Sequence, residues 1–213
     1  MNLKENTNLV FQRVTKAVQE AGREVDSVSV IAVTKYVNAS TASQLIDQGV
    51  RHMGENRVDK FLEKYQYLSD RDITWHLIGS LQRRKVKDVI AYVDYFHALD
   101  SLKLAEEIQK RANRKIKCFL QVNISGEETK HGFSKEELMN LLPDLAKLDK
   151  IEYVGLMTMA PFEAETEELQ KEIQQKLIPN MPMTELSMGM SRDYKEAIQF
   201  GSTFVRIGTS FFK

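Results

Sequence analysis

The regular alternation of helix-like and strand-like segments is the feature of this sequence that most constrains its fold. Short apolar runs alternate with longer segments in which apolar residues recur at three- and four-residue spacing. The predicted strands are residues 28–34, 50–53, 74–78, 95–99, 117–124, 151–158, 184–188 and 203–207. The predicted helices are residues 3–22, 41–49, 57–68, 81–92, 102–112, 135–148, 163–177 and 192–200. Alternation of this kind indicates parallel strands joined by crossover helices.

Eight such strands predict an α/β fold of the (β/α)8 TIM-barrel type, beginning with a helix and ending with the eighth strand. The chain has 213 residues, near the lower limit of roughly 200 for this fold, so we expect a single domain over residues 1–213. An open doubly wound sheet is the alternative. It usually carries a glycine-rich turn after its first strand, and here Lys35, Tyr36 and Val37 occupy that position. The barrel is therefore favoured.

The composition narrows the classes of function. Lys plus Arg equals Asp plus Glu at 30 each, so no net charge draws the protein to nucleic acid or to a membrane surface. No apolar run approaches the roughly 20 residues that span a bilayer, and the N-terminal residues lack the apolar core of a signal peptide. The single cysteine, Cys118, forms no internal disulfide, and no Cys/His cluster has metal-binding spacing. We expect a cytoplasmic protein.

Lys35 is the first candidate for chemistry. With a period of two, Ile31, Val33 and Lys35 point to one face of the first predicted strand. A lysine at the end of an inward-facing row has two interpretations. Its amine either extends out of the strand end into water, or stands in a pocket with a lowered pKa and forms a Schiff base.

Other distinctive residues follow predicted strands at the same end of the barrel. Asn56 follows the second strand, Ser191 begins the helix after the seventh, and Gly208 and Thr209 follow the eighth. The loops after strands seven and eight of such barrels often bind phosphate, and a helix N-terminus favours anions. Arg206 shares the face of Gly208, so an inward orientation would bring a permanent cation into the barrel mouth.

A reactive lysine, a phosphate cradle and an inward arginine suggest pyridoxal 5′-phosphate (PLP) as the cofactor. Its aldehyde would join Lys35, and its phosphate would lie at Ser191 and the Gly208-Thr209 turn. Arg206 would donate to an unprotonated pyridine nitrogen, which leaves PLP a weaker electron sink. Two further residues are candidates beside the cofactor ring, Met188 in contact with it and His76 beneath it, although a core histidine is an equal interpretation of His76.

The motifs that carry these residues resemble the PLP homeostasis (PLP-binding) protein family, which is related to the alanine racemase barrel. They are AVTKY, GENRV, WHLIGSLQRRK, QVNISGEETKHGF, GLMTMAP and LSMGMSRDYKEAIQFGSTFVRIGTSFF. The resemblance implies a Schiff base at Lys35, a pocket lined by Asn56, and a phosphate and ring nitrogen held by Ser191, Arg206, Gly208 and Thr209. It also implies a protein that buffers and supplies PLP without turnover. The run Arg83-Arg84-Lys85 departs from the family pattern.

The alternative function is a PLP-dependent racemase or decarboxylase of the same barrel type. Racemisation needs bases on opposite faces of the substrate, and by resemblance alanine racemase takes its second base from an additional β domain. This sequence reaches Lys213 directly after the eighth strand, so we expect no such domain. PLP-dependent apoenzymes are candidate recipients of the cofactor. We expect a monomer or weak dimer without nucleic-acid or membrane partners.

Overall fold

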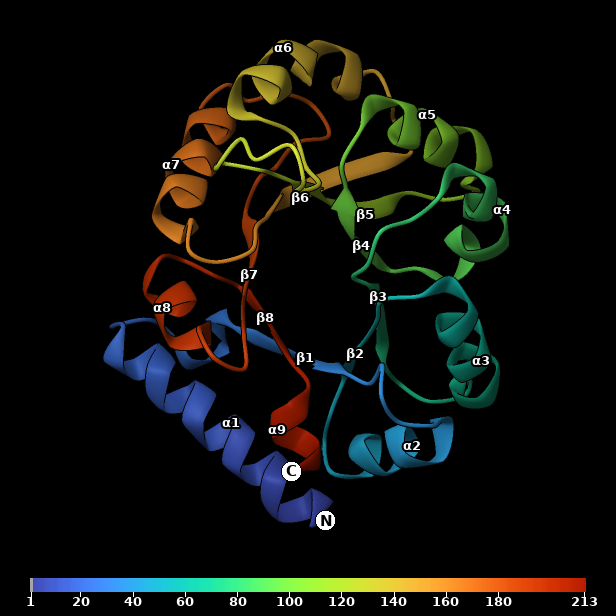
Figure 1. Cartoon of the computed structure of the whole chain (residues 1–213), viewed down its shortest axis with the longest axis vertical. Helices are drawn as coiled ribbons and strands as arrows, with labels where there is room; N and C mark the ends of the chain where they lie inside the picture. Colours follow the sequence, from blue (N-terminus) through green and yellow to red (C-terminus); the bar gives the residue numbers. More distant parts are fainter. Residues whose placement is uncertain (1) are drawn as a thin grey trace.

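The computed structural model of the protein describes residues 2–213 and shows a closed barrel of eight parallel strands in chain order (Figure 1). The strands are β1 (Ser29–Val33), β2 (His52–Glu55), β3 (Thr74–Leu77), β4 (Tyr95–Leu99), β5 (Ile116–Gln121), β6 (Ile151–Met157), β7 (Glu185–Met190) and β8 (Phe204–Ile207). Pairing of β1 with β8 closes the sheet. The predicted barrel is confirmed.

Helices surround the barrel. They are α1 (Leu3–Glu20), α2 (Ala39–Asp47), α3 (Val58–Leu68), α4 (Val86–Val89), α5 (Leu102–Arg111), α6 (Lys135–Ala146), α7 (Glu163–Gln174), α8 (Tyr194–Gln199) and α9 (Thr209–Phe212). The 3-10 helices are η1 (Val25–Ser27), η2 (Arg83–Lys85) and η3 (Ile90–Tyr92). None of the helices in residues 2–213 has the length and apolar character needed to cross a membrane.

The first helix covers the seam at which the barrel closes. Val10 and Val14 of α1 are buried in one hydrophobic cluster with Ala32 of β1, and with Val205 and Ile207 of β8. These strand residues therefore face outward. Because side chains alternate along a strand, Ile31, Val33, Phe204 and Arg206 face the barrel interior. Helix α1 thus occupies the position that a helix after β8 would otherwise fill, as the sequence predicts.

The structure differs locally from the predicted elements at three places. The predicted helix 81–92 is divided into η2, α4 and η3. Helix α8 begins at Tyr194 rather than at 192, because Asp193 Oδ1 accepts the backbone N–H of Met190 at 2.5 Å and closes a turn there. The short helix α9 follows β8, an addition to the predicted elements.

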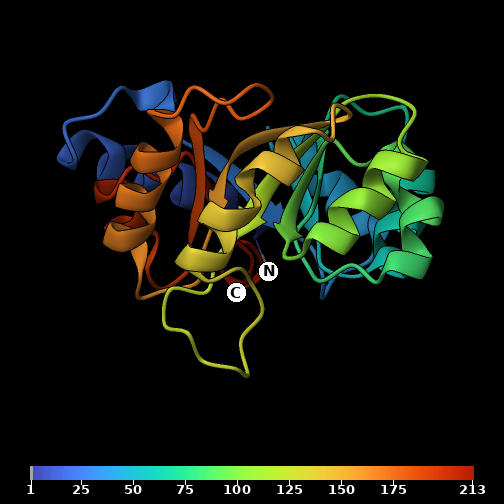
Figure 2. The same ribbon diagram turned by 90° about the horizontal axis from the view of Figure 1, so that it is seen from above.

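The carboxyl ends of the strands define one face of the barrel. The longest connection, residues 122–134 between β5 and α6, projects from this face (Figure 2). Its base is tied to the barrel, since the backbone N–H of Asn123 donates to the carbonyl of Phe133 at 2.8 Å. The same face carries all the residues predicted to bind the cofactor, apart from Met188.

Candidate functional site

A cavity of about 520 Å³ opens at the carboxyl ends of the strands. Four strands, β1, β6, β7 and β8, and the turns that follow six of the eight strands supply its lining. The lining residues are Val33, Lys35, Tyr36, Asn56, Ile78, Met157, Met159, Met190, Ser191, Arg192, Asp193, Arg206, Gly208, Thr209 and Phe212. The structure therefore brings together six of the seven residues expected to bind the cofactor.

Lys35 lies on a turn at the rim of this cavity. Strand β1 ends at Val33, and the backbone N–H of Val37 donates to the carbonyl of Thr34 at 3.1 Å, so the chain turns before Lys35 can extend the inward row. The lysine side chain is exposed, and its Nζ lies 4.9 Å from the centre of the Tyr36 ring. Its amine is thus reachable from solvent and borders the cavity.

A buried ion pair supports the turn that carries Lys35. The side chains of Lys64 and Glu55 are 1% and 0% exposed, and they form a short ion pair. Lys64 Nζ also donates to the carbonyl of Thr34 at 2.6 Å, and the Thr34 hydroxyl donates to Glu55 Oε1 at 2.6 Å. These contacts fix the position of Thr34, the residue immediately before Lys35. The sequence signal for this cluster is Lys64, which stands at the helical spacing of the apolar residues Phe61 and Leu68.

Arg206 is a buried cation at the floor of the cavity. Only 6% of the residue is exposed. Its Nη1 donates to Ser187 Oγ at 2.6 Å, and its Nη2 donates to the carbonyl of Thr158 at 3.2 Å. No carboxylate in residues 2–213 forms an ion pair with it, and burial lowers its pKa to about 10. A ligand that accepts hydrogen bonds would satisfy this group, because buried charges need partners.

Two turns beside Arg206 present unpaired backbone donors. Within residues 2–213, the backbone N–H groups of Ser191, Arg192 and Gly208 donate no hydrogen bond. A Cβ at Gly208 would lie 3.3 Å from the Val33 carbonyl, so glycine permits the close approach of β8 to β1 here. Ser191 does not cap α8 as predicted, since Asp193 is the N-cap residue. Turn amides therefore form this cradle, which has the chemistry of an anion site.

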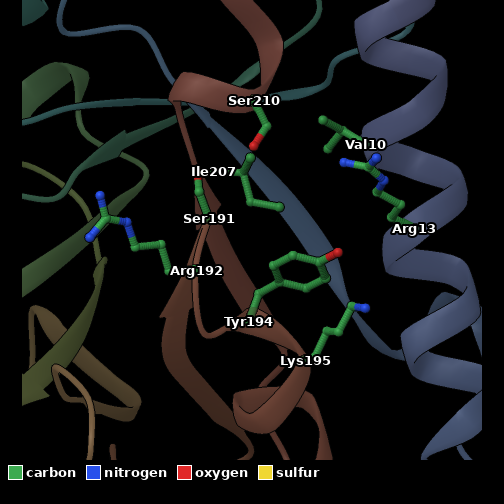
Figure 3. Close-up of a pocket in the computed structure, with 8 residues that line it drawn as sticks. All are labelled: Val10, Arg13, Ser191, Arg192, Tyr194, Lys195, Ile207 and Ser210. Carbon is green, nitrogen blue, oxygen red and sulfur yellow. The ribbon is translucent and has the colours of Figure 1, made fainter. Parts of the chain in front are cut away.

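A second cavity of about 420 Å³ adjoins the Ser191 turn on the side of α1. Arg13 from α1 and Lys195 from α8 extend into the space between the two helices, whereas Arg192 extends away from α1 (Figure 3). The hydroxyl of Tyr194 points toward α1 in the same view. Three cations, Arg13, Arg192 and Lys195, thus line the cavity beside the turn, and their positive potential favours an anion there.

The remaining predicted site residues differ in their outcome. Asn56 lines the cavity, and the adjacent turn packs closely on it, because a Cβ at Gly79 would collide with the Asn56 carbonyl. Met188 is fully buried in the main hydrophobic cluster and does not line the cavity. The register between β7 and β8 shifts between Ser187 and Met190, so Met190 lies at the cavity instead.

The sequence analysis did not identify the polar partners beneath Arg206. Ser187 holds the guanidinium, and His97 holds Ser187 through a contact of 2.8 Å between its Nδ1 and Ser187 Oγ. The period-two pattern of β4 and β7 could have indicated these residues, because it places the side chains of His97 and Ser187 on the inward face of their strands.

Comparisons with known proteins agree with this architecture. The sequence model of the family described as "Alanine racemase, N-terminal domain" matches residues 11–213. A protein of Aquifex aeolicus named pyridoxal phosphate homeostasis protein is 39% identical over 225 residues, which cover 100% of this chain and 98% of that protein. The structure of PipY from Synechococcus elongatus with PLP bound has a TM-score of 0.83 at 33% identity and covers 94% of this chain and 100% of PipY. An alanine racemase of Bartonella henselae has a TM-score of 0.70 at 16% identity, covering 98% of this chain and 58% of the racemase, and shares the fold.

Proposed function

The chain belongs to the pyridoxal phosphate homeostasis proteins of the alanine racemase N-terminal domain family, and we propose that it binds PLP and serves in the homeostasis of this cofactor. The observation that carries the proposal is the composition of one cavity. A solvent-reachable lysine, a buried arginine without a carboxylate partner in residues 2–213, and two turns whose amides have no partner there line the same 520 Å³ space. These groups match the aldehyde, the ring nitrogen and the phosphate of PLP.

Each end of the cofactor has a protein group of the required chemistry. Lys35 joins the aldehyde as a Schiff base, for which its amine must be free of a fixed partner. The amides of Ser191, Arg192 and Gly208 hold the phosphate together with Thr209, because such turns bind anions without a helix dipole. Arg206 donates to the ring nitrogen, and Asn56 lines the pocket wall.

The proposed role is storage and supply of PLP without turnover. Support comes from the name of the Aquifex relative, which describes homeostasis rather than catalysis. The exposure of Lys35 also suits exchange of PLP with PLP-dependent apoenzymes, since the cofactor would be reachable at the rim of the barrel. The alternative is a racemase or decarboxylase of the same barrel type.

The first experiment is the visible absorption spectrum of the protein after addition of PLP. We expect a Schiff-base band in the wild type that is absent in Lys35→Ala. The matched control is Lys16→Ala, which removes a lysine on α1 whose side chain is 76% exposed, and which should keep the band. We expect Arg206→Ala to weaken PLP retention and to change the band while the barrel remains folded by circular dichroism.

Two outcomes would contradict parts of this proposal. A wild-type protein without a band, or a Lys35→Ala variant that keeps one, would remove the Schiff base from Lys35. Incubation of the loaded protein with L- and D-amino acids separates the two functions, because racemisation or decarboxylation would establish the enzyme alternative and exclude a role without turnover.

A further inference from the structure

A continuous chain of polar side chains crosses the barrel interior below Arg206. Arg206 Nη1 donates to Ser187 Oγ at 2.6 Å, and Ser187 Oγ lies 2.8 Å from His97 Nδ1. His97 Nε2 lies 2.8 Å from His76 Nδ1, and His76 Nε2 lies 2.9 Å from His52 Nδ1. We call Ser187, His97, His76 and His52 the histidine relay. It includes three of the four histidines of the protein.

The relay connects the two faces of the barrel. Ser187, His97 and His76 are completely buried. His52 is the first residue of β2 and is partly exposed, and it lines a cavity of about 430 Å³ at the amino ends of the strands. Arg206 lines the cavity at the opposite face. The Ser187 end of the relay therefore reaches the ligand cavity through Arg206, and the His52 end reaches solvent.

Aromatic rings enclose the relay. The ring of Phe119 stacks on His97 with centroids 4.4 Å apart, and that of Tyr95 stacks on His76 at 4.8 Å. Phe204 lies 5.6 Å from His52 in an edge-on contact. The low polarity of these surrounding aromatic rings strengthens each hydrogen bond of the relay and makes an unpaired ring nitrogen costly in free energy. Each ring must therefore match its donor to its neighbour's acceptor.

Ser187 sets the direction of the hydrogen bonds. Its oxygen accepts from Arg206, and among residues 2–213 the acceptor in reach of its hydroxyl hydrogen is His97 Nδ1. His97 then carries its proton on Nε2 and donates to His76 Nδ1, and His76 donates in the same way to His52. All bonds run from Arg206 to His52, and burial lowers the pKa of both His76 and His97 well below the ordinary value. Both rings are neutral at neutral pH.

From this geometry we propose that the histidine relay positions Arg206 and transmits the protonation of His52, at the amino face of the barrel, to the ligand cavity at the carboxyl face. The ligand in the cavity rests on the proposed function, whereas the coupling of His52 to Arg206 does not. Ser187, His97, His76 and His52 are thus positioning residues, since they act on the ligand through Arg206.

The proton balance of the transmission is simple. The change adds one proton, which enters from solvent in the cavity that Arg206 lines and ends on His52. His52 Nδ1 takes the Nε2 proton of His76, His76 Nδ1 takes that of His97, and His97 Nδ1 takes the hydroxyl proton of Ser187. Ser187 regains a proton from Arg206 Nη1, which solvent replaces, so His76, His97, Ser187 and Arg206 keep their charges. Arg206 keeps its bond to Ser187, but Ser187 no longer donates to His97 and therefore accepts from Arg206 less strongly.

The environment of His52 determines the pH at which it is protonated. Burial lowers the pKa of His52, and the charge of Asp94 opposes that effect. The titratable and charged groups that face His52 are His76 from β3, Asp94 before β4, Tyr95 from β4, Arg114 and Lys115 before β5, and Lys117 from β5. Because burial has the larger effect on the pKa of His52, we expect its protonation below its ordinary range.

The test uses the full chain with ¹⁵N-labelled histidine and arginine, titrated from about pH 8 to about pH 5 without ligand. We expect the imidazole signals of His76 and His97 to change from the Nε2–H to the Nδ1–H form at the midpoint of His52, with a concurrent shift of the Arg206 side-chain signal. His52→Gln retains an acceptor for His76 without a titrating group, and should abolish both changes. His131→Gln, in the exposed loop, should preserve them.

The second arm measures PLP affinity over the same pH range. In the wild type we expect a loss of affinity that exceeds the loss in His52→Gln by about fivefold, in the usual range of coupling between distant sites. Ser187→Ala should show the flatter affinity profile of His52→Gln, because it breaks the link between His97 and Arg206. Fixed tautomers during His52 titration, or a wild-type profile in Ser187→Ala, would overturn the relay. Absence of PLP binding with an intact Arg206 response would contradict the proposed function alone.

Discussion

At the scale of single residues, the neutral histidines of the barrel interior make stability depend on pH. His76 and His97 are completely buried, and their pKa values are well below the ordinary value because of burial. In the unfolded chain both rings titrate near the ordinary value of 6.5. Below pH 6.5 the unfolded state binds protons that the folded state does not. The free energy of unfolding therefore has its full value above this pH and decreases as the pH falls below it.

We therefore predict that the free energy of unfolding decreases below pH 6.5 by about 1.4 kcal/mol per pH unit for each buried histidine. Urea unfolding followed by circular dichroism between about pH 7 and about pH 5 measures this slope. His131→Gln should leave the slope unchanged, because the ring is exposed. A stability that is flat over this range would show that His76 and His97 are accessible to protons in the folded state.

Residue by residue, the sequence predicted the carboxyl face better than the barrel interior. Lys35, Asn56, Ser191, Arg206, Gly208 and Thr209 were predicted together because each follows or ends a strand, and barrel topology places these positions on one face. Ser187 and His97 each stand at an inward polar position of a strand, but their contact joins β4 to β7 across the interior, so spacing along the chain does not show that they meet. Met188 was expected to contact the cofactor ring, but it lies in the core and Met190 lines the cavity, because the register between β7 and β8 shifts at a place that the sequence pattern does not show.

At the scale of elements, the turn between β1 and α2 depends on an ion pair from two other elements. Glu55 ends β2 and Lys64 lies in α3, and together they hold Thr34, the residue before Lys35. Glu55 Oε2 has no hydrogen-bond partner within residues 2–213, so Lys64 compensates the charge of the carboxylate. Such a pair contributes more to the geometry of the turn than to net stability, because both charges are desolvated.

We predict that Lys64→Met destabilises the fold by about 3–5 kcal/mol, because it leaves the Glu55 carboxylate buried without its counterion. The double variant Lys64→Met/Glu55→Gln should recover much of this loss. Lys60→Met provides the control on the same helix, since the side chains of its ion pair with Glu63 are 45% and 52% exposed and such pairs contribute about 0–1 kcal/mol. Equal effects of Lys64→Met and Lys60→Met in urea unfolding would contradict the structural role of the buried pair.

The boundaries of elements were the least predictable part of the fold. The predicted strand 50–53 is β2 at His52–Glu55, because the preceding residues complete the turn after α2. Helix α8 is shorter than predicted since the side chain of Asp193 stabilises a turn instead of extending the helix. Periodicity indicates which face of an element is buried, whereas its ends depend on individual hydrogen bonds that periodicity does not contain.

At the scale of the whole molecule, barrel closure makes every strand an interior strand. Each strand pairs with two neighbours, and the pair β1 and β8 joins the ends of the sheet. Helix α1 covers this seam with its own hydrophobic cluster, so the start of the chain stabilises its end. Removing one strand would expose hydrogen-bonding groups on two others. A single domain was predicted over residues 1–213, and we therefore expect it to unfold as one cooperative unit.

Cys118 reports on this cooperativity, because it is the single cysteine of the chain and lies in β5 with no exposed surface. Burial also raises the pKa of its thiol, so the reactive thiolate is disfavoured in the folded state. We predict that thiol labelling of Cys118 requires global opening, with a rate whose dependence on urea equals that of global unfolding. Labelling that is rapid, or independent of urea, would place β5 in a region that opens separately from the barrel. The matched probe is Ser69→Cys on the surface after α3, where labelling should be fast at all urea concentrations.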